Sequence, residues 1–94
     1  MAMRQDPKEI KINFPEKIQA GVYANNMVVG HTKEEFILDF IMVSPPVGTV
    51  TARVIVSPGH MKRVLEALRD NVSKYESAFG PIEIAEEPRG RVMS

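Results

Sequence analysis

Residues 35–57 contain two runs of β-branched and aromatic side chains around a proline-rich loop, Ser44-Pro45-Pro46-Val47-Gly48. Such runs, bounded by turn residues, predict a β-hairpin. Counted outward from Pro46, one face of the hairpin carries the pairs Phe36–Val56, Leu38–Val54, Phe40–Ala52 and Met42–Val50. On the opposite face Asp39 meets Arg53, while three branched residues, Ile37, Ile41 and Val43, lie beside Ile55, Thr51 and Thr49. The hairpin is therefore predicted to be apolar on both faces.

A long amphipathic helix is predicted directly after the hairpin. Ser57 followed by Pro58 is a typical helix start, since serine caps the first amides and proline suits the first helical position. Apolar residues then recur every three or four positions, which forms one stripe on a helix of about six turns: Met61, Val64, Leu65, Leu68, Val72, Tyr75 and Phe79. Gly80 and Pro81 mark its end.

Further strands are predicted upstream and downstream of these elements. Residues 22–29 have strand propensity, and Gly30-His31-Thr32-Lys33 forms the turn to the next strand; the register of residues 22–29 stays open, because a slip of one residue inverts the faces. Residues 10–14 alternate as a short half-buried strand that ends at Pro15. Residues 17–21 are a connector, and residues 82–84 are a candidate for a very short edge strand.

The predicted fold class is α+β. It consists of an antiparallel meander of three or four strands followed by one long C-terminal helix packed on one face. One domain spans residues 10–84, between a flexible arm at residues 1–9 and a flexible tail at residues 85–94.

One helix can cover only one side of this sheet, so the other side needs a partner. Exposed apolar patches of this size mark interfaces, and the simplest partner is a second copy, which predicts a homodimer or higher homo-oligomer. The predicted interface comprises Ile37, Asp39, Ile41, Val43, Arg53 and Ile55. The Asp39–Arg53 pair has two readings, a solvated cross-strand ion pair or a desolvated pair that fixes register inside the interface.

The charge composition indicates which classes of partner to expect. The 94 residues hold 12 basic and 12 acidic residues, so the chain lacks the basic field typical of nucleic-acid binding and of attraction to acidic membranes. We therefore expect neither as a partner. The absence of cysteine favours a reducing cytoplasm, and the N-terminal residues lack the apolar core of a secretion signal.

No set of residues predicts catalysis, so we expect the protein not to be an enzyme and to have no catalytic, cofactor-binding or metal-binding residues. His31 and His60 lack clustered ligands, and Ser57 is expected to cap the helix. An oligomeric active site built from Asp39, Arg53 and asparagines is the enzymatic alternative. Asn25 and Asn26 are either exposed strand amides or polar interface contacts.

Four segments together resemble a small bacterial and archaeal family known only as a domain of unknown function (DUF3467-like): residues 22–25, 35–40, 53–58 and 74–80. The resemblance covers roughly residues 20–84 and implies no activity. A looser similarity to SecB-type export chaperones implies sheets and helices stacked into dimers and tetramers that hold unfolded, apolar segments without a cofactor. We therefore expect a non-enzymatic, homo-oligomeric binding or adaptor protein, with SecB-like holding of apolar peptides as one form. The alternative is an accessory subunit of a larger complex.

Overall fold

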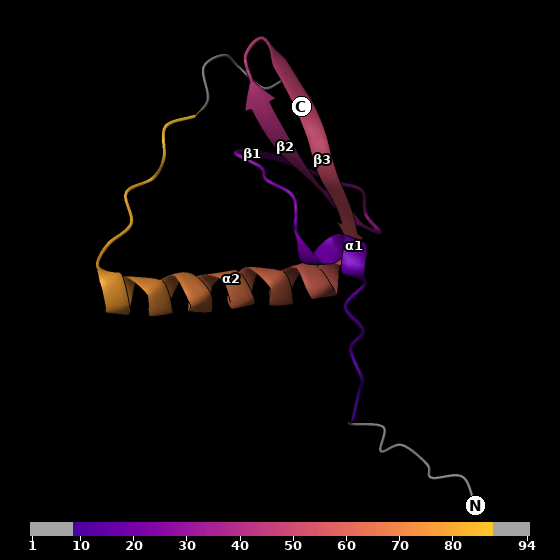
Figure 1. The fold of residues 1–94 in the computed structure, drawn as a ribbon. Coiled ribbons are helices and arrows are strands. Elements are labelled where there is room, and N and C mark those ends of the chain that lie inside the picture. The colour runs from indigo at the N-terminus through magenta and orange to yellow at the C-terminus, as the bar shows by residue number, and fades with distance from the viewer. Residues whose placement is uncertain (1–8, 88–94) are drawn as a thin grey trace, which may run out of the picture.

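The computed structural model describes residues 9–87 of the chain. Its elements follow in the order α1 (Glu16–Gln19), β1 (Asn26–His31), β2 (Phe36–Ser44), β3 (Val47–Val56) and α2 (Pro58–Phe79) (Figure 1). The three strands form one antiparallel sheet in the order β1-β2-β3. The predicted α+β fold, a meander followed by one C-terminal helix, is confirmed. The predicted arm and tail fall largely outside the described residues.

The β2–β3 hairpin is tighter than predicted. Ser44 pairs with Val47, so the turn consists of Pro45 and Pro46 alone, which are joined by a cis peptide bond. The predicted five-residue loop is therefore wrong, because both strands continue to the edge of the proline pair.

The predicted register of this hairpin is correct from Phe36 to Phe40 and wrong beyond it. Asp39 pairs with Arg53 and Phe40 with Ala52, but Ile41 pairs with Val50 and Met42 with Thr49. Thr51 is an extra residue in β3, a β-bulge that shifts the pairing by one position. As a result, Val50 lies on the same face as Ile41, whereas the alternation alone had put it beside Met42.

Strand β1 starts and ends later than the sequence indicated. It spans Asn26–His31, with Val28 opposite Asp39 and Val29 opposite Leu38, so residues 22–25 precede the strand and Gly30 and His31 belong to it. The turn to β2 is held by Thr32, whose Oγ1 accepts hydrogen bonds from the amides of Glu34 and Glu35 at 3.1 and 3.2 Å. This pairing settles the register that the sequence left open.

Helix α2 has the predicted ends. The Ser57 Oγ accepts a hydrogen bond from the His60 amide at 3.2 Å, and Pro58 occupies the first turn. At the other end, Gly80 adopts φ +94°, and its amide donates to the Glu76 carbonyl at 2.8 Å. The Glu76 side chain also accepts from the Ile82 amide at 2.9 Å. Both ends of α2 are thus capped by residues that lie close in the sequence.

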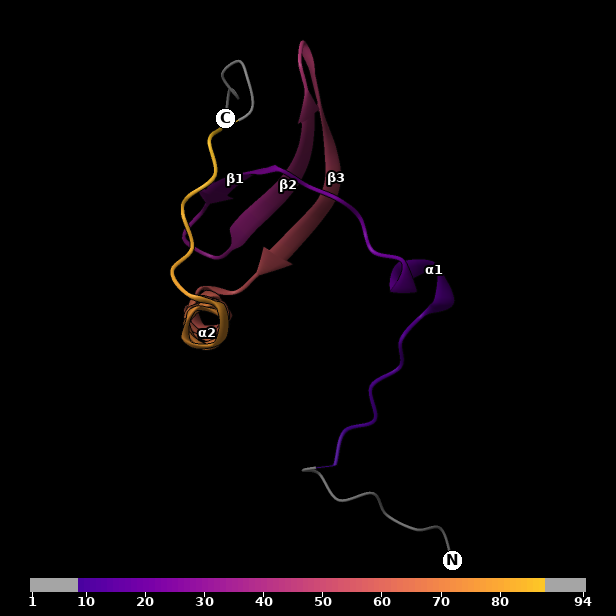
Figure 2. The ribbon, with the colours of Figure 1, turned by 60° about the vertical axis from the view of Figure 1, so that its left-hand side comes forward.

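The predicted packing of α2 on the sheet is wrong for the single chain. Only Ser57 separates β3 from α2, and the helix runs crosswise below the end of the sheet where β3 stops (Figures 1 and 2). Contacts between elements are concentrated within the sheet. Leu65, Leu68 and Val72 are 47%, 59% and 47% exposed, so the stripe remains open to solvent.

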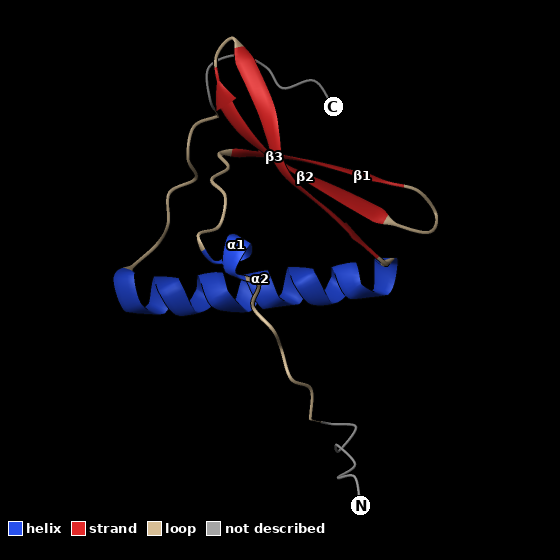
Figure 3. Cartoon of the chain, turned by 45° about the vertical axis from the view of Figure 1, so that its right-hand side comes forward, coloured by secondary structure: helices blue, strands red, loops and turns tan. Residues whose placement is uncertain are grey.

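The core within the described residues is small. Leu38 and Ile41 are the buried hydrophobic residues. The Cα radius of gyration is 17.6 Å, whereas a compact domain of this length has about 12 Å. The chain is therefore an open arrangement of a sheet and a helix (Figure 3).

Two other strand predictions are also wrong. Residues 10–14 form no strand, and their side chains Ile10, Ile12 and Phe14 stay exposed. The connector after them contains the short helix α1. Residues 82–84 are likewise outside any strand. Alternation alone does not make a strand, because a strand also needs a neighbour for its backbone hydrogen bonds.

Candidate functional site

Cross-strand pairing gives the sheet two chemically different faces. The face of Asp39, called here the Asp39 face, carries Ile37, Ile41 and Val43 from β2 and Ile55 and Arg53 from β3. The face of Phe40, called here the Phe40 face, carries Phe36 and Leu38, together with their partners on the neighbouring strands. The two faces follow from the period-two alternation of strands.

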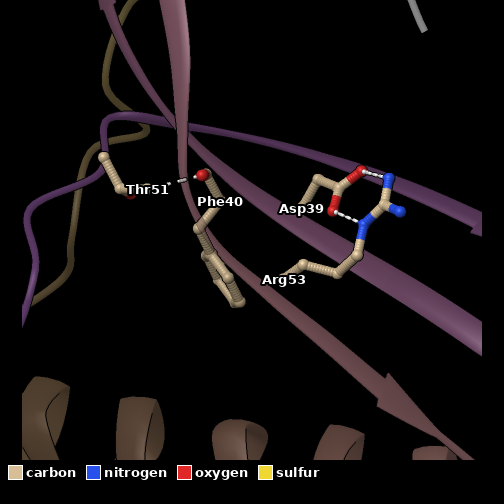
Figure 4. A network of polar contacts seen from close by, with 4 residues as sticks. All are labelled: Asp39, Phe40, Thr51 and Arg53. Atoms are coloured by element: carbon tan, nitrogen blue, oxygen red, sulfur yellow. Dashed lines mark hydrogen bonds and ion pairs between the residues drawn. The ribbon is translucent and has the colours of Figure 1, made fainter. Parts of the chain in front are cut away.

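The ion pair on the Asp39 face is bidentate. Arg53 Nε donates to Asp39 Oδ1 at 2.7 Å, and Arg53 Nη2 donates to Asp39 Oδ2 at 2.9 Å. Figure 4 shows the two side chains facing each other across the strands, with the dashed lines marking both bonds. This fork geometry is the one that arginine forms best with a carboxylate. The predicted pairing of these residues is confirmed.

The pair shifts the proton affinities of both groups. The hydrogen bonds from Arg53 lower the pKa of Asp39, partial desolvation opposes that shift, and the guanidinium charge reinforces it. The same contact raises the pKa of Arg53. The Asp39 side chain is 17% exposed and that of Arg53 is 61% exposed. The carboxylate is therefore sheltered, while the guanidinium keeps much of its contact with water.

The six residues of the predicted interface lie together on the Asp39 face but differ in exposure. Ile41 is buried, Ile37, Asp39 and Val43 are half-buried, and Ile55 is 51% exposed. The chain itself therefore shelters the part of this face around Ile41. Ile41 thus has cover within its own chain, and the interface between copies formed by these six residues stays a prediction.

Residues 22–25 are tied across the hairpin by side-chain hydrogen bonds. The Asn25 side chain accepts from the Val43 amide at 2.8 Å and donates to the Val43 carbonyl at 3.0 Å. The Thr51 hydroxyl lies 3.2 Å from the carbonyls of both Tyr23 and Phe40. The segment thus passes from β3 to β1 (Figure 2). The Asn25 side chain is therefore part of the hydrogen bonding within the fold.

The larger apolar surface is on the Phe40 face and on α2, where sequence reasoning expected the core. Met27, Val29, Met42 and Val54 of the Phe40 face are between 37% and 46% exposed. Figure 4 shows Phe40 pointing toward the side on which α2 runs. The seven-residue stripe of Met61, Val64, Leu65, Leu68, Val72, Tyr75 and Phe79 is called here the α2 stripe. Its first two residues are half-buried, and the other five are exposed, Phe79 the most at 75%.

Two of the remaining polar candidates, Ser57 and His31, make contacts within the fold. Ser57 is engaged as the helix cap, and His31 stacks near Phe36 with ring centroids 5.4 Å apart. Across residues 9–87, no three His, Cys, Asp or Glu side chains gather as metal ligands would. In the same range, no helix is both long and apolar enough to cross a bilayer.

Comparison with known protein families finds one family that matches most of the chain. Residues 1–84 match the family described as "Protein of unknown function (DUF3467)". The chain belongs to this family. The DUF3467 match spans both the sheet and the helix, so the Phe40 face, the Asp39 face and the α2 stripe are all parts of the family domain. No curated protein and no solved structure matches the chain, and the SecB-type similarity therefore finds no support there.

Proposed function

We propose that this DUF3467 protein is a non-enzymatic, homo-oligomeric binding or adaptor protein. The observation that carries the proposal is the imbalance between its small core and its large apolar surface. Among the described residues, only Leu38 and Ile41 are buried hydrophobic residues, while the α2 stripe and the edges of both sheet faces are open. Full burial of one such side chain stabilises by about 1.5–3 kcal/mol, so association offers a large gain in stability.

The surface area leads to the same proposal. The chain has 9029 Å² of accessible surface, whereas a compact monomer of its mass has about 5,400 Å². Extended segments outside the sheet account for part of the excess. The excess still exceeds the roughly 800 Å² that each partner contributes to a standard interface. The exposed apolar residues of the sheet and of α2 are part of this open surface, which supports an interface between copies.

The second partner in this proposal is an apolar peptide segment, such as an unfolded chain exposes. The open surfaces offer branched aliphatic residues, aromatic rings and methionines, which adapt to varied apolar shapes. Charge plays a small part, since the chain has no net charge. The proposal includes a cytoplasmic location, because a protein without cysteine suits a reducing compartment.

Light scattering at micromolar concentration tests the assembly. We expect a mass of two chains or a multiple of two, and a folded monomer would overturn the proposal. Protection of an unfolding client from aggregation tests the peptide binding. Oligomers that neither protect a client nor bind apolar peptides would overturn the binding role while leaving the assembly intact.

An accessory subunit of a larger complex is the second candidate, favoured by residues 10–14. Ile10, Ile12 and Phe14 alternate as in a strand, yet they are 79%, 85% and 64% exposed. Such a segment can add to the edge of another protein's sheet. Affinity purification from the native host tests this candidate. We expect a stoichiometric partner that is lost when Ile12 is changed to aspartate.

A further inference from the structure

The α2 stripe and the Phe40 face are two uncovered surfaces of matching character. The positions on the Phe40 face hold no lysine, arginine, aspartate or glutamate. They are Met27, Val29 and His31 on β1, Phe36, Leu38, Phe40 and Met42 on β2, and Thr49, Ala52, Val54 and Val56 on β3. The α2 stripe is likewise uncharged, because the lysines, arginines and acids of α2 lie outside it. The Asp39 face is different, since it carries the Asp39–Arg53 ion pair. The stripe therefore suits the Phe40 face better than the Asp39 face.

The two surfaces also match in length. Helix α2 has 22 residues, which at 1.5 Å per residue is about 33 Å. Strand β3 has 10 residues, which at 3.3 Å per residue is also about 33 Å. A helix laid along the sheet would thus cover the full length of the hairpin.

The one-residue connection between β3 and α2 keeps the helix off its own sheet. Ser57 alone separates Val56 from Pro58, and it is extended, with φ −69° and ψ 157°. Its side chain caps the helix at the His60 amide, and Pro58 has its φ fixed by the ring. A helix that folds back on its own sheet needs a turn of at least two residues in ordinary βα connections. The exposure of Leu65 and later stripe residues is the result.

We propose that two copies exchange helices, so that the α2 stripe of each chain packs on the Phe40 face of the other. The inference rests on the proposed homo-oligomeric function and names its interface. Twofold symmetry makes the two contacts equivalent, so both chains bury both surfaces at once. Short connections that prevent closure within a chain are a known cause of such exchange.

A disulfide test reads the exchange directly, because the natural chain has no cysteine. Val54→Cys marks the Phe40 face and Leu68→Cys marks the α2 stripe. The two single variants, with tags of different size, are mixed, unfolded, refolded together and oxidised. We expect a disulfide-linked dimer that contains both tags, formed at least about tenfold more efficiently than by the controls because of the high effective concentration at an interface.

The matched controls place one cysteine on the opposite surface. Arg53→Cys lies on the Asp39 face, next to Val54 in sequence, and is paired with Leu68→Cys. Asp70→Cys lies on the side of α2 opposite the stripe and is paired with Val54→Cys. Equal cross-linking in the test and control pairs would overturn the inference, since it would show random collision.

A chain carrying both Val54→Cys and Leu68→Cys separates the two arrangements. An interchain bond supports exchange, whereas an internal bond in a single chain overturns it. Light scattering on the unsubstituted chain keeps the two proposals apart. If it finds an oligomer while the cysteines bond internally or not at all, only the exchange fails. If it finds a folded monomer, the homo-oligomeric function fails as well.

Discussion

The side chain of Asn25 pairs with the backbone of Val43 as a second peptide group would. Its oxygen accepts from the Val43 amide at 2.8 Å, and its nitrogen donates to the Val43 carbonyl at 3.0 Å. The backbone amide of Asn25 also donates a hydrogen bond to the Ile41 carbonyl at 3.0 Å. One residue before β1 thereby extends the ladder along β2 by a further pair of hydrogen bonds.

Replacing Asn25 tests this extension. Asn25→Ala removes both side-chain bonds, and we expect a loss of about 1–2 kcal/mol in the free energy of unfolding, measured by urea denaturation. Asn25→Asp keeps the acceptor for the Val43 amide but places a carboxylate oxygen against the Val43 carbonyl. It should therefore destabilise at least as much as alanine at pH 7. Stability equal to that of the natural chain would contradict the pairing.

The Asp39–Arg53 pair predicts a specific response to acid. Folding lowers the pKa of Asp39, so the unfolded chain binds the proton at a higher pH than the folded chain does. The stabilisation is therefore fully present above the unfolded pKa of about 4 and is lost as the pH falls through the lower folded value. Urea denaturation between pH 2 and pH 6 measures this slope, and Asp39→Asn should flatten it.

Arg53→Lys is the control for that slope. Lysine keeps the positive charge but has no planar fork for two parallel bonds. We therefore expect a smaller lowering of the Asp39 pKa and a weaker acid response than in the natural chain. An unchanged slope in both variants would show that the pair does not govern the acid limb.

Two glycines predict opposite effects of the same change to alanine. At Gly48, an added Cβ would lie 3.5 Å from Ile41 and 3.6 Å from Val43, which is ordinary van der Waals contact. Gly48→Ala should thus leave stability unchanged or raise it by up to about 1 kcal/mol. Gly80 has φ +94° and ψ 173°, a region that is essentially restricted to glycine, so Gly80→Ala should destabilise by about 1–3 kcal/mol. Thermal unfolding of the two variants side by side measures the contrast.

The helix cap gives another test. Ser57→Ala removes the acceptor for the His60 amide, and we expect a loss of about 1 kcal/mol. Ser57→Asp keeps an acceptor there and adds a negative charge at the helix N-terminus, which is favourable. Circular dichroism during urea denaturation should rank the aspartate variant at or above the natural chain and the alanine variant below it.

The sequence predicted best what depends on local chemistry. Ser57, Pro58 and Gly80 mark the ends of α2 because capping needs only neighbouring residues. The Asp39–Arg53 pairing followed from counting along the hairpin. The count failed at Thr51, since a bulge at a β-branched residue carries no glycine or proline to mark it.

What the sequence could not predict depends on contacts between distant segments. The bonds between Asn25 and Val43 continue the pairing one residue before β1, and propensity does not encode them. The pattern of α2 showed correctly that one side of the helix is apolar. It did not show that the helix would lie off its own sheet, because periodicity identifies the apolar side of a helix but not the surface that covers it.

The single residue between β3 and α2 sets how far the helix can swing. Inserting three or four glycine and serine residues after Val56 would give the helix a flexible tether, and its own sheet would then be present at an effective concentration in the millimolar range. At micromolar protein, such a tethered helix would outcompete one from a neighbouring molecule. In the proposed exchange, the length of this one-residue connection decides whether α2 packs on its own sheet or on the sheet of a neighbouring chain.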